Sequence, residues 1–329
     1  MSMRTVSIPG IPFELPALGF GCSRLTGTSR RTALRLLETA FDNGVRHFDT
    51  ARYYGYGESE RLLGLFARSR RAQITITSKF GIQPPSQTSP LRLLLSVGRR
   101  FVRMVPAARK VAQSSANKLL AAPSPFAADE CRKSLETSLR ELGTDYLDFF
   151  LLHDYVVTGA EHEELLAFLE SAVRSGKIRF FGIGTGIVQV LHALQSQPEF
   201  CRMVQFENSA VVRNFRDFDT AVTELVITHG SLGNSFQKLH SSLVSNRGLA
   251  RSWSQKLGLD CSNGETLATL MLNYAVFANS KGLVLFSSTS VSRTEKNVRS
   301  IFQNGFSDEQ LAVFGKLTEQ IQIEEHAEA

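Results

Sequence analysis

Short apolar runs alternate with amphipathic segments along most of this 329-residue chain. The runs are almost continuously apolar, which is typical of strands that are buried on both faces, as in a parallel sheet. Eight runs have strand length: 18–22, 45–50, 74–80, 146–153, 178–184, 203–208, 224–230 and 282–288. The segments between them, such as RRTALRLLETAFDNG, have the spacing of helices with one apolar face. The pattern predicts β-α units in series.

About eight such units in a chain of this size favour a closed (β/α)8 TIM barrel over an open doubly wound sheet. We therefore expect an α/β fold in which residues 1–329 form a single barrel domain. Ahead of the first unit, TVSIPGIPFEL predicts an N-terminal β-hairpin around Pro9-Gly10, on the floor of the barrel. Three glycines stand where helix C-caps are expected: Gly44, Gly143 and Gly176.

Two connections are too long to be plain turns, and both leave the C-terminal ends of strands, where barrel enzymes build their sites. The connection after the third strand, 82–127, is predicted to be an inserted basic lid. The connection after the seventh strand, 231–264, contains Trp253 and is predicted to be a substrate-side loop. We expect these loops and the C-terminal tail to determine substrate specificity.

The composition, 43% hydrophobic and 21% charged, is that of an ordinary globular protein. No apolar run reaches about 18 residues, and the first ten residues have no signal-peptide core, so neither a membrane span nor a leader is expected. The four cysteines are scattered without a Cys-x-x-Cys pair. They indicate a reducing compartment, and we expect a cytoplasmic protein without a disulfide framework or zinc knuckle.

The formal net charge of +6 comes from one segment. Between Ile82 and Ala128 there are seven basic residues and no acidic ones, and the rest of the chain has 30 basic and 31 acidic residues. The charge therefore does not predict a nucleic-acid partner. Within this segment, 91–105 has two interpretations: a basic amphipathic helix that contacts an anionic membrane surface or an acidic partner, or a lid over the site. Either would favour an anionic cofactor or substrate.

Three polar residues each close an apolar run: Asp49, Lys79 and His153. Buried charges are costly unless they are paired or used. Tyr54 follows Asp49 by five residues, just beyond the strand. Since the second, third and fourth strands of a barrel are neighbours, we expect the four side chains to meet at one rim.

These groups suit proton transfer. A phenol has a pKa of about 10, and a nearby ammonium lowers it; Asp49 would pair with and position Lys79. The sequence thus predicts that Tyr54 is a general acid with a lowered pKa, and that His153 hydrogen-bonds the same substrate oxygen. Carbonyl reduction by hydride transfer needs this chemistry. Each residue alone has a plain structural explanation, but three successive strand ends together indicate a site.

From LGFGCSRL to RTEKNV the chain resembles the aldo-keto reductase superfamily. The motifs that carry the resemblance are Asp49-Thr50-Ala51-Arg52-Tyr53-Tyr54, Glu60-Arg61-Leu62-Leu63-Gly64, Thr77-Ser78-Lys79 and LDFFLLH ending at His153. The resemblance implies that Tyr54 is the proton donor and that Asp49, Lys79 and His153 complete a catalytic tetrad. YYGYGESE and Leu-Leu-His-Asp are most similar to the branch of sugar and aldose dehydrogenases and bacterial aldo/keto reductases. The implied substrate is a small aldehyde, ketone or sugar.

The resemblance also implies a nicotinamide dinucleotide bound without a Rossmann domain. Gln205 matches the glutamine that hydrogen-bonds the carboxamide, and an adenosine-phosphate region is matched by Ser287, Ser288, Arg293 and Asn297. Because Arg293 can pair with a 2′-phosphate, NADPH is the expected cofactor. Departures from the family pattern leave NADH open: Gly184-Thr185 replaces Ser-Asn, His229 replaces a stacking tyrosine, and Ser287 replaces a lysine.

Three other interpretations remain at this point. GIGTG at 182–186, with Glu207 about 20 residues later, resembles a Rossmann fingerprint but fits a strand-to-helix turn better. A regulatory subunit that binds NADPH with little turnover is an alternative function. A metal-dependent barrel hydrolase would use His47, Asp49 and His153, although no further His-rich cluster completes a ligand set and no metal is expected.

Overall fold

Eight parallel strands close into a barrel in the order β10-β11-β12-β3-β4-β5-β8-β9. The structure is a computed structural model that describes residues 4–83, 122–123, 126–157, 162–216, 218–303 and 305–327. The barrel strands are β3 (Leu18–Gly21), β4 (His47–Asp49), β5 (Thr75–Phe80), β8 (Leu147–His153), β9 (Ile178–Gly184), β10 (Met203–Glu207), β11 (Leu225–His229) and β12 (Leu283–Phe286). All eight predicted strands are confirmed, and so is the TIM barrel.

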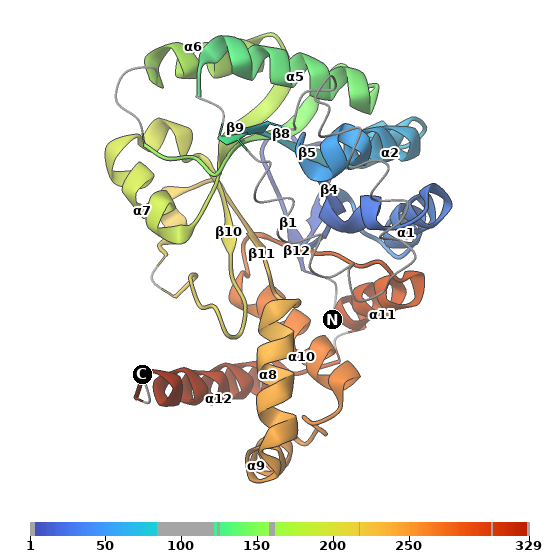
Figure 1. Ribbon diagram of the computed structural model, residues 1–329, viewed down its shortest axis with the longest axis vertical. Coiled ribbons are helices and arrows are strands. Elements are labelled where there is room, and N and C mark those ends of the chain that lie inside the picture. Colours follow the sequence, from blue (N-terminus) through green and yellow to red (C-terminus); the bar gives the residue numbers. More distant parts are fainter. Residues whose placement is uncertain are drawn as a thin grey trace.

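Helices surround the barrel, as Figure 1 shows. They are α1 (Arg30–Asp42), α2 (Glu58–Ala67), α5 (Ala128–Leu142), α6 (His162–Arg174), α7 (Ile187–Ser196), α8 (Asn234–Ser245), α9 (Arg247–Leu257), α10 (Gly264–Ala278), α11 (Val291–Phe302) and α12 (Asp308–Ala327). Short 3-10 turns are η1 (Cys22–Gly27), η2 (Tyr54–Gly57), η3 (Arg71–Gln73), η4 (Pro198–Phe200) and η5 (Thr220–Val222). Gly143 caps α5 in the left-handed conformation, as predicted.

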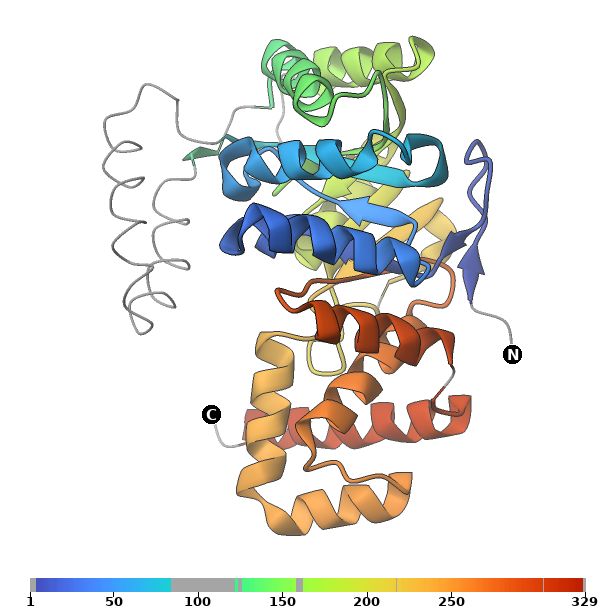
Figure 2. The same cartoon turned by 90° about the vertical axis from the view of Figure 1, so that its right-hand side faces the viewer.

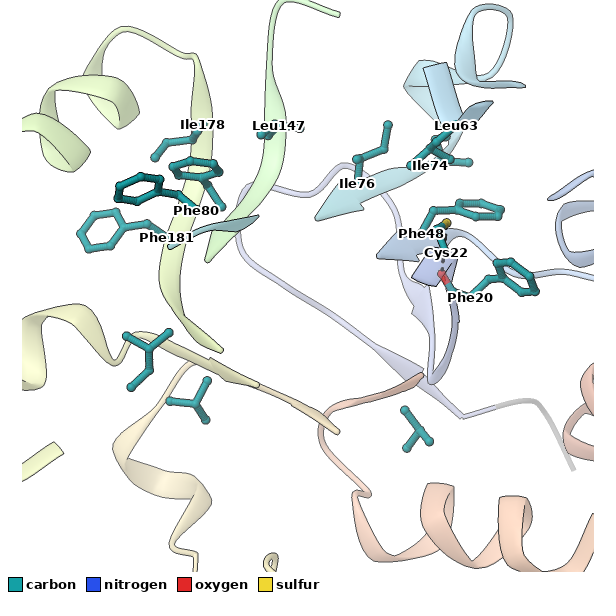
Figure 3. Close-up of a cluster of buried hydrophobic side chains, with 14 of the residues drawn as sticks. Phe20, Cys22, Phe48, Leu63, Ile74, Ile76, Phe80, Leu147, Ile178 and Phe181 are labelled. Atoms are coloured by element: carbon teal, nitrogen blue, oxygen red, sulfur yellow. Dashed lines mark hydrogen bonds between the residues drawn. The ribbon is translucent and has the colours of Figure 1, made fainter. Parts of the chain in front are cut away.

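A continuous apolar layer lies between the strands and the helices. Side chains of alternate strand residues point outward into it, and Figure 3 shows Phe20, Phe48 and Ile76 from three successive strands there. The Phe20 and Phe48 rings lie 6.3 Å apart, and Phe48 lies 5.1 Å from Phe66 of α2. The residues between these outward positions point into the barrel. This alternation decides which polar residues reach its interior.

The predicted hairpin covers the N-terminal end of the barrel. Its strands β1 (Thr5–Val6) and β2 (Leu15–Pro16) pair antiparallel, and Figure 2 shows them at one end of the strands. Val6, Ile8 and Leu15 pack against interior residues such as Phe149 and Leu225 in one buried cluster. The hairpin therefore closes the floor of the barrel, and the opposite end carries the cavity described below.

The connection after the seventh strand differs from the prediction. Most of 231–264 forms α8 and α9, which extend from the barrel together with α10 and α12 (Figures 1 and 2). Trp253 is buried in a second apolar cluster with Phe314 and Leu239, so it does not face substrate. The apolar spacing along this segment supports helices, which bury their apolar faces against α10 and α12.

The predicted basic lid, 82–127, and its segment 91–105 lie almost entirely outside the described residues. The described parts are β6 (Ile82–Gln83) and β7 (Ala122–Pro123), which pair antiparallel, and the approach to α5 from Phe126. No helix in the described part of the chain is long and apolar enough to cross a membrane.

Candidate active site

A cavity of about 500 Å³ lies at the C-terminal ends of the barrel strands. Asp49 and His153 end their strands and Lys79 is the last residue but one of β5, and all three stand at inward-facing positions that line the cavity. Tyr54 joins them from the turn after β4. The structure thus brings together all four residues that the sequence predicted to be catalytic.

Asp49 and Lys79 form a buried ion pair. Lys79 Nζ lies 2.6 Å from Asp49 Oδ1 and donates a second hydrogen bond to the Thr50 carbonyl at 3.0 Å. Each residue is only 3% exposed. The other carboxylate oxygen of Asp49 accepts a 3.0 Å bond from Gln205 Nε2, a contact that strand order alone did not predict. Removing both charges from water is costly, and these additional hydrogen bonds offset part of that cost.

Tyr54 is held beside this pair by a tight turn. Gly55 and Tyr56 have left-handed backbones with φ of 60° and 59°, and a side chain at Gly55 would collide with η1. The Lys79 ammonium lies 5.2 Å from the centroid of the Tyr54 ring. The imidazole of His153 meets the Tyr54 ring edge-on, with centroids 6.2 Å apart.

The predicted lowering of the Tyr54 pKa is wrong. Burial raises the pKa of Tyr54 above its usual value of 10.0, and the Lys79 charge offsets only part of that rise. Burial lowers the pKa of Lys79, but Asp49 and Tyr54 outweigh it, and the net shift is upward. The pKa of His153 is lowered to about 3, mainly by burial and in addition by the positive charge of Lys79. At neutral pH the phenol therefore keeps its proton, the lysine is charged, and His153 is neutral.

A second buried carboxylate connects the segments that carry Tyr54 and Lys79. Glu60 in α2 is fully buried, and its Oε2 accepts a 2.7 Å hydrogen bond from Arg52 in the Tyr54 turn. Its Oε1 accepts a 2.7 Å bond from Ser78 Oγ, the residue before Lys79. Glu60 thus fixes the distance between the two segments. The sequence marked Glu60 as part of a motif but gave no partner for it.

The predicted cofactor residues divide into two groups. Those that line the cavity are Gly184, Thr185, Gln205, His229 and Ser287. Those that do not are Ser288, which precedes α11, and Arg293 and Asn297, which lie within it. Ser288 Oγ bonds the backbone of Ser290 in this turn, and Arg293 is exposed. Their part in cofactor binding stays a prediction.

The metal and Rossmann interpretations do not fit this geometry. His47 lies buried inside the barrel, where its Nδ1 is 2.9 Å from Thr75 Oγ1 and its Nε2 is 3.4 Å from Thr77 Oγ1. In the described ranges, no group of three or more His, Cys, Asp or Glu could hold a metal ion. Gly182 and Gly184 lie in β9 of a closed barrel, and Gly186 is the N-cap residue of α7. A side chain at Gly182 would meet the Met203 carbonyl oxygen at 2.1 Å, so this glycine serves close strand packing.

Comparison with known families decides the assignment. The sequence model of the family described as "Aldo/keto reductase family" matches residues 17–319. The chain belongs to the aldo/keto reductase family.

Individual relatives of this aldo/keto reductase are distant. It is 28% identical to a D-threo-aldose 1-dehydrogenase from Pseudomonas sp over 189 residues, which cover 54% of this chain and 52% of that protein. It is 29% identical to a probable aldo-keto reductase 1 from Glycine max over 177 residues, covering 52% and 42%. The chain thus matches about half the length of these curated relatives.

Solved structures share the fold of this aldo/keto reductase. An aldo-keto reductase from Klebsiella pneumoniae in complex with NADPH superposes with a TM-score of 0.68 at 20% identity, covering 97% of this chain and 96% of that one. A glycerol dehydrogenase from Gluconobacter oxydans gives 0.70 at 16% identity, covering 97% and 96%. At these identities the likeness establishes the fold.

The cavity of this aldo/keto reductase fits an anionic dinucleotide. Ser231 lines the cavity just before the start of α8. Its Oγ is buried and has no hydrogen-bond partner among the described residues. Arg24 lines the same part, and Gly233, with φ of 71°, leads into the first turn of α8. A buried hydroxyl, a guanidinium and the N-terminus of a 12-residue helix are donors for phosphate. Arg24 and Ser231 were not predicted, because Arg24 lies in the LGFGCSRL segment without a role of its own there and Ser231 belongs to no motif.

Proposed function

We propose that this protein is an NAD(P)H-dependent oxidoreductase that interconverts a carbonyl and an alcohol, with Tyr54 as proton donor. One observation carries the proposal: the buried Asp49–Lys79 ion pair lies beside Tyr54, with Lys79 Nζ 5.2 Å from the ring centroid, at the wall of a cavity. The substrate is an aldehyde, ketone or sugar. The D-threo-aldose 1-dehydrogenase among the relatives agrees with this class.

The four residues divide the proton chemistry. Lys79 stays cationic because the buried Asp49 carboxylate compensates its charge. Its positive charge beside Tyr54 would stabilise negative charge on the Tyr54 oxygen after the proton leaves. Tyr54 is protonated at neutral pH and gives its proton to the oxygen of the reduced carbonyl. His153 is neutral, so it orients that oxygen by a hydrogen bond and is unsuited to be the acid.

The bound nicotinamide would supply the hydride. Gly184, Thr185, Gln205 and His229 line the wall on which its ring and carboxamide would lie. Arg24, Ser231 and the start of α8 would hold its diphosphate. We propose NADPH as the preferred cofactor, supported by Arg293 as a partner for a 2′-phosphate and by the NADPH bound to the Klebsiella pneumoniae protein. The buried, unpaired cysteines support a cytoplasmic location.

A turnover screen tests the proposal. Purified full-length protein is mixed with NADPH or NADH and with aldehydes, ketones and aldoses, and absorbance at the reduced-nicotinamide band is followed. The expected result is carbonyl-dependent oxidation that is faster with NADPH. NADPH binding without oxidation for any carbonyl would instead favour the regulatory subunit. Failure to bind either cofactor would refute both functions.

A further inference from the structure

We propose that Asp154 is a specificity-determining residue that binds a hydroxyl group of the substrate, which makes the substrate class a hydroxylated aldehyde or ketone. This inference rests on the proposed function. It begins from the position of Asp154, which directly follows His153 at the end of β8 and lines the same cavity. A substrate oxygen held by Tyr54 and His153 would therefore occupy the same cavity that Asp154 lines.

The backbone at Asp154 is unusual. Its φ is 54°, in the left-handed region, and within the described residues the only other non-glycine residue with positive φ is Tyr56, in the active-site turn. Asparagine and aspartate enter this region more easily than other residues, but the conformation still persists only where its surroundings fix it. Here the Asp154 N–H donates to the Gly184 carbonyl at 2.8 Å, which ties the turn to β9. The side chain is thus held at the rim.

The Asp154 carboxylate is available to a ligand. In the part of the chain that the structure describes, no donor hydrogen-bonds it. It differs in this respect from Asp49, whose two oxygens are both occupied by Lys79 and Gln205. Asp154 is an exposed residue, although partial burial of its carboxyl raises the pKa above the usual value. A carboxylate would repel the diphosphate of a dinucleotide, so Asp154 suits the substrate side of the cavity.

Most polar side chains of the lining belong to the proton chemistry or to the proposed cofactor site, and among the described lining residues Asp154, Ser23 and Glu207 are assigned to neither. Among the lining residues that the structure describes, those with purely apolar side chains are Leu232, Leu285 and Phe286. Small-molecule sites are usually lined mainly by apolar side chains. A hydroxyl can donate to Asp154 without bringing a second charge into the cavity, and a site built for such a bond discriminates against analogues that lack the hydroxyl.

The test compares substrates that differ in their hydroxyls. Turnover is measured with glyceraldehyde and propionaldehyde, and with dihydroxyacetone and acetone, for wild type and for Asp154→Asn and Asp154→Gly. Both variants tolerate a positive φ, so the turn is retained. Asp145→Asn is the matched control, because Asp145 is an exposed aspartate beside the opposite end of β8.

We expect Asp154→Gly to lower kcat/KM for the hydroxylated substrates by about tenfold or more, with little change for propionaldehyde and acetone. Asp154→Asn should fall between wild type and Asp154→Gly, because a neutral acceptor makes the weaker bond. Equal losses for both members of a pair, or an unchanged ratio, would overturn the inference and leave the proposed function standing. Wild-type protein that reduces none of the four compounds would overturn the inference, and a wider screen without any turnover would overturn the proposed function too.

Discussion

Replacing Glu60 with leucine tests whether the buried carboxylate stabilises the site as its contacts indicate. The change removes the acceptor of both Arg52 and Ser78. Removing one partner of a buried ion pair costs about 3–5 kcal/mol. Arg52 is still 16% exposed, and Ser78 keeps Ser138 Oγ at 3.4 Å, so we expect the lower end, about 3 kcal/mol.

The matched control is Glu141→Leu. Arg61 and Glu141 form a pair of similar length, 2.6 Å, but the Arg61 side chain is 53% exposed. Exposed pairs contribute about 0–1 kcal/mol. Thermal unfolding followed by circular dichroism should therefore show a decrease in midpoint of about 6 °C for Glu60→Leu and at most about 2 °C for Glu141→Leu.

Activity should change in a specific way. Because Glu60 connects the Tyr54 turn with the strand of Lys79, its loss should lower kcat, while the affinity for NADPH, measured by fluorescence titration, stays near wild type. Glu60→Gln keeps one hydrogen-bond acceptor in place, so it should lower both the unfolding midpoint and kcat less than Glu60→Leu does. Equal midpoint shifts for Glu60→Leu and Glu141→Leu would refute the assignment of Glu60 as a buried connection.

Two further predictions concern protonation and cofactor binding. Burial lowers the pKa of His47 to about 4 in the folded chain, whereas the imidazole of the unfolded chain binds a proton near pH 6.5. Above pH 6.5 His47 is neutral in both states and costs the folded state nothing. As the pH falls from 6.5 towards 4, protonation of the unfolded chain lowers the free energy of unfolding. His47→Gln should therefore lose stability less steeply over this window, by up to about 1.4 kcal/mol per pH unit in urea titrations, and an unchanged slope would contradict this. Arg24→Gln should weaken NADPH binding about tenfold in a fluorescence titration, whereas Arg31→Gln, an exposed change on α1, should not. Equal affinities for the two variants would exclude Arg24 from the diphosphate site.

The barrel and the four central residues could be predicted from sequence because the signals are local. Strands buried on both faces are apolar throughout, so a charged residue that closes one stands out, as Asp49 and Lys79 do. The direction of the Tyr54 pKa shift could not be predicted, since it depends on how much burial outweighs a neighbouring ammonium. The sequence shows which side chains carry a charge, but only the packed structure shows how far each of them is removed from water.

Other features required the closed barrel. Arg24 follows β3 and Ser231 follows β11, and they meet only because β12 pairs with both strands. The helical pattern of α8 and α9 was present in the sequence, in the spacing of Leu239, Leu243 and Trp253, but the length of the connection favoured a loop. The apolar faces of α8 and α9 are buried against α10 and α12, which lie after the connection in the chain.

The central claim is that the Tyr54 hydroxyl supplies the proton. Its most direct test is the rate of carbonyl-dependent NADPH oxidation by Tyr54→Phe, beside Tyr53→Phe, which removes the hydroxyl of a neighbour that does not line the cavity. We expect Tyr54→Phe to bind NADPH normally and to lose at least about a hundredfold in kcat, while Tyr53→Phe stays near wild type. A Tyr54→Phe protein that turns over as fast as Tyr53→Phe would contradict the claim.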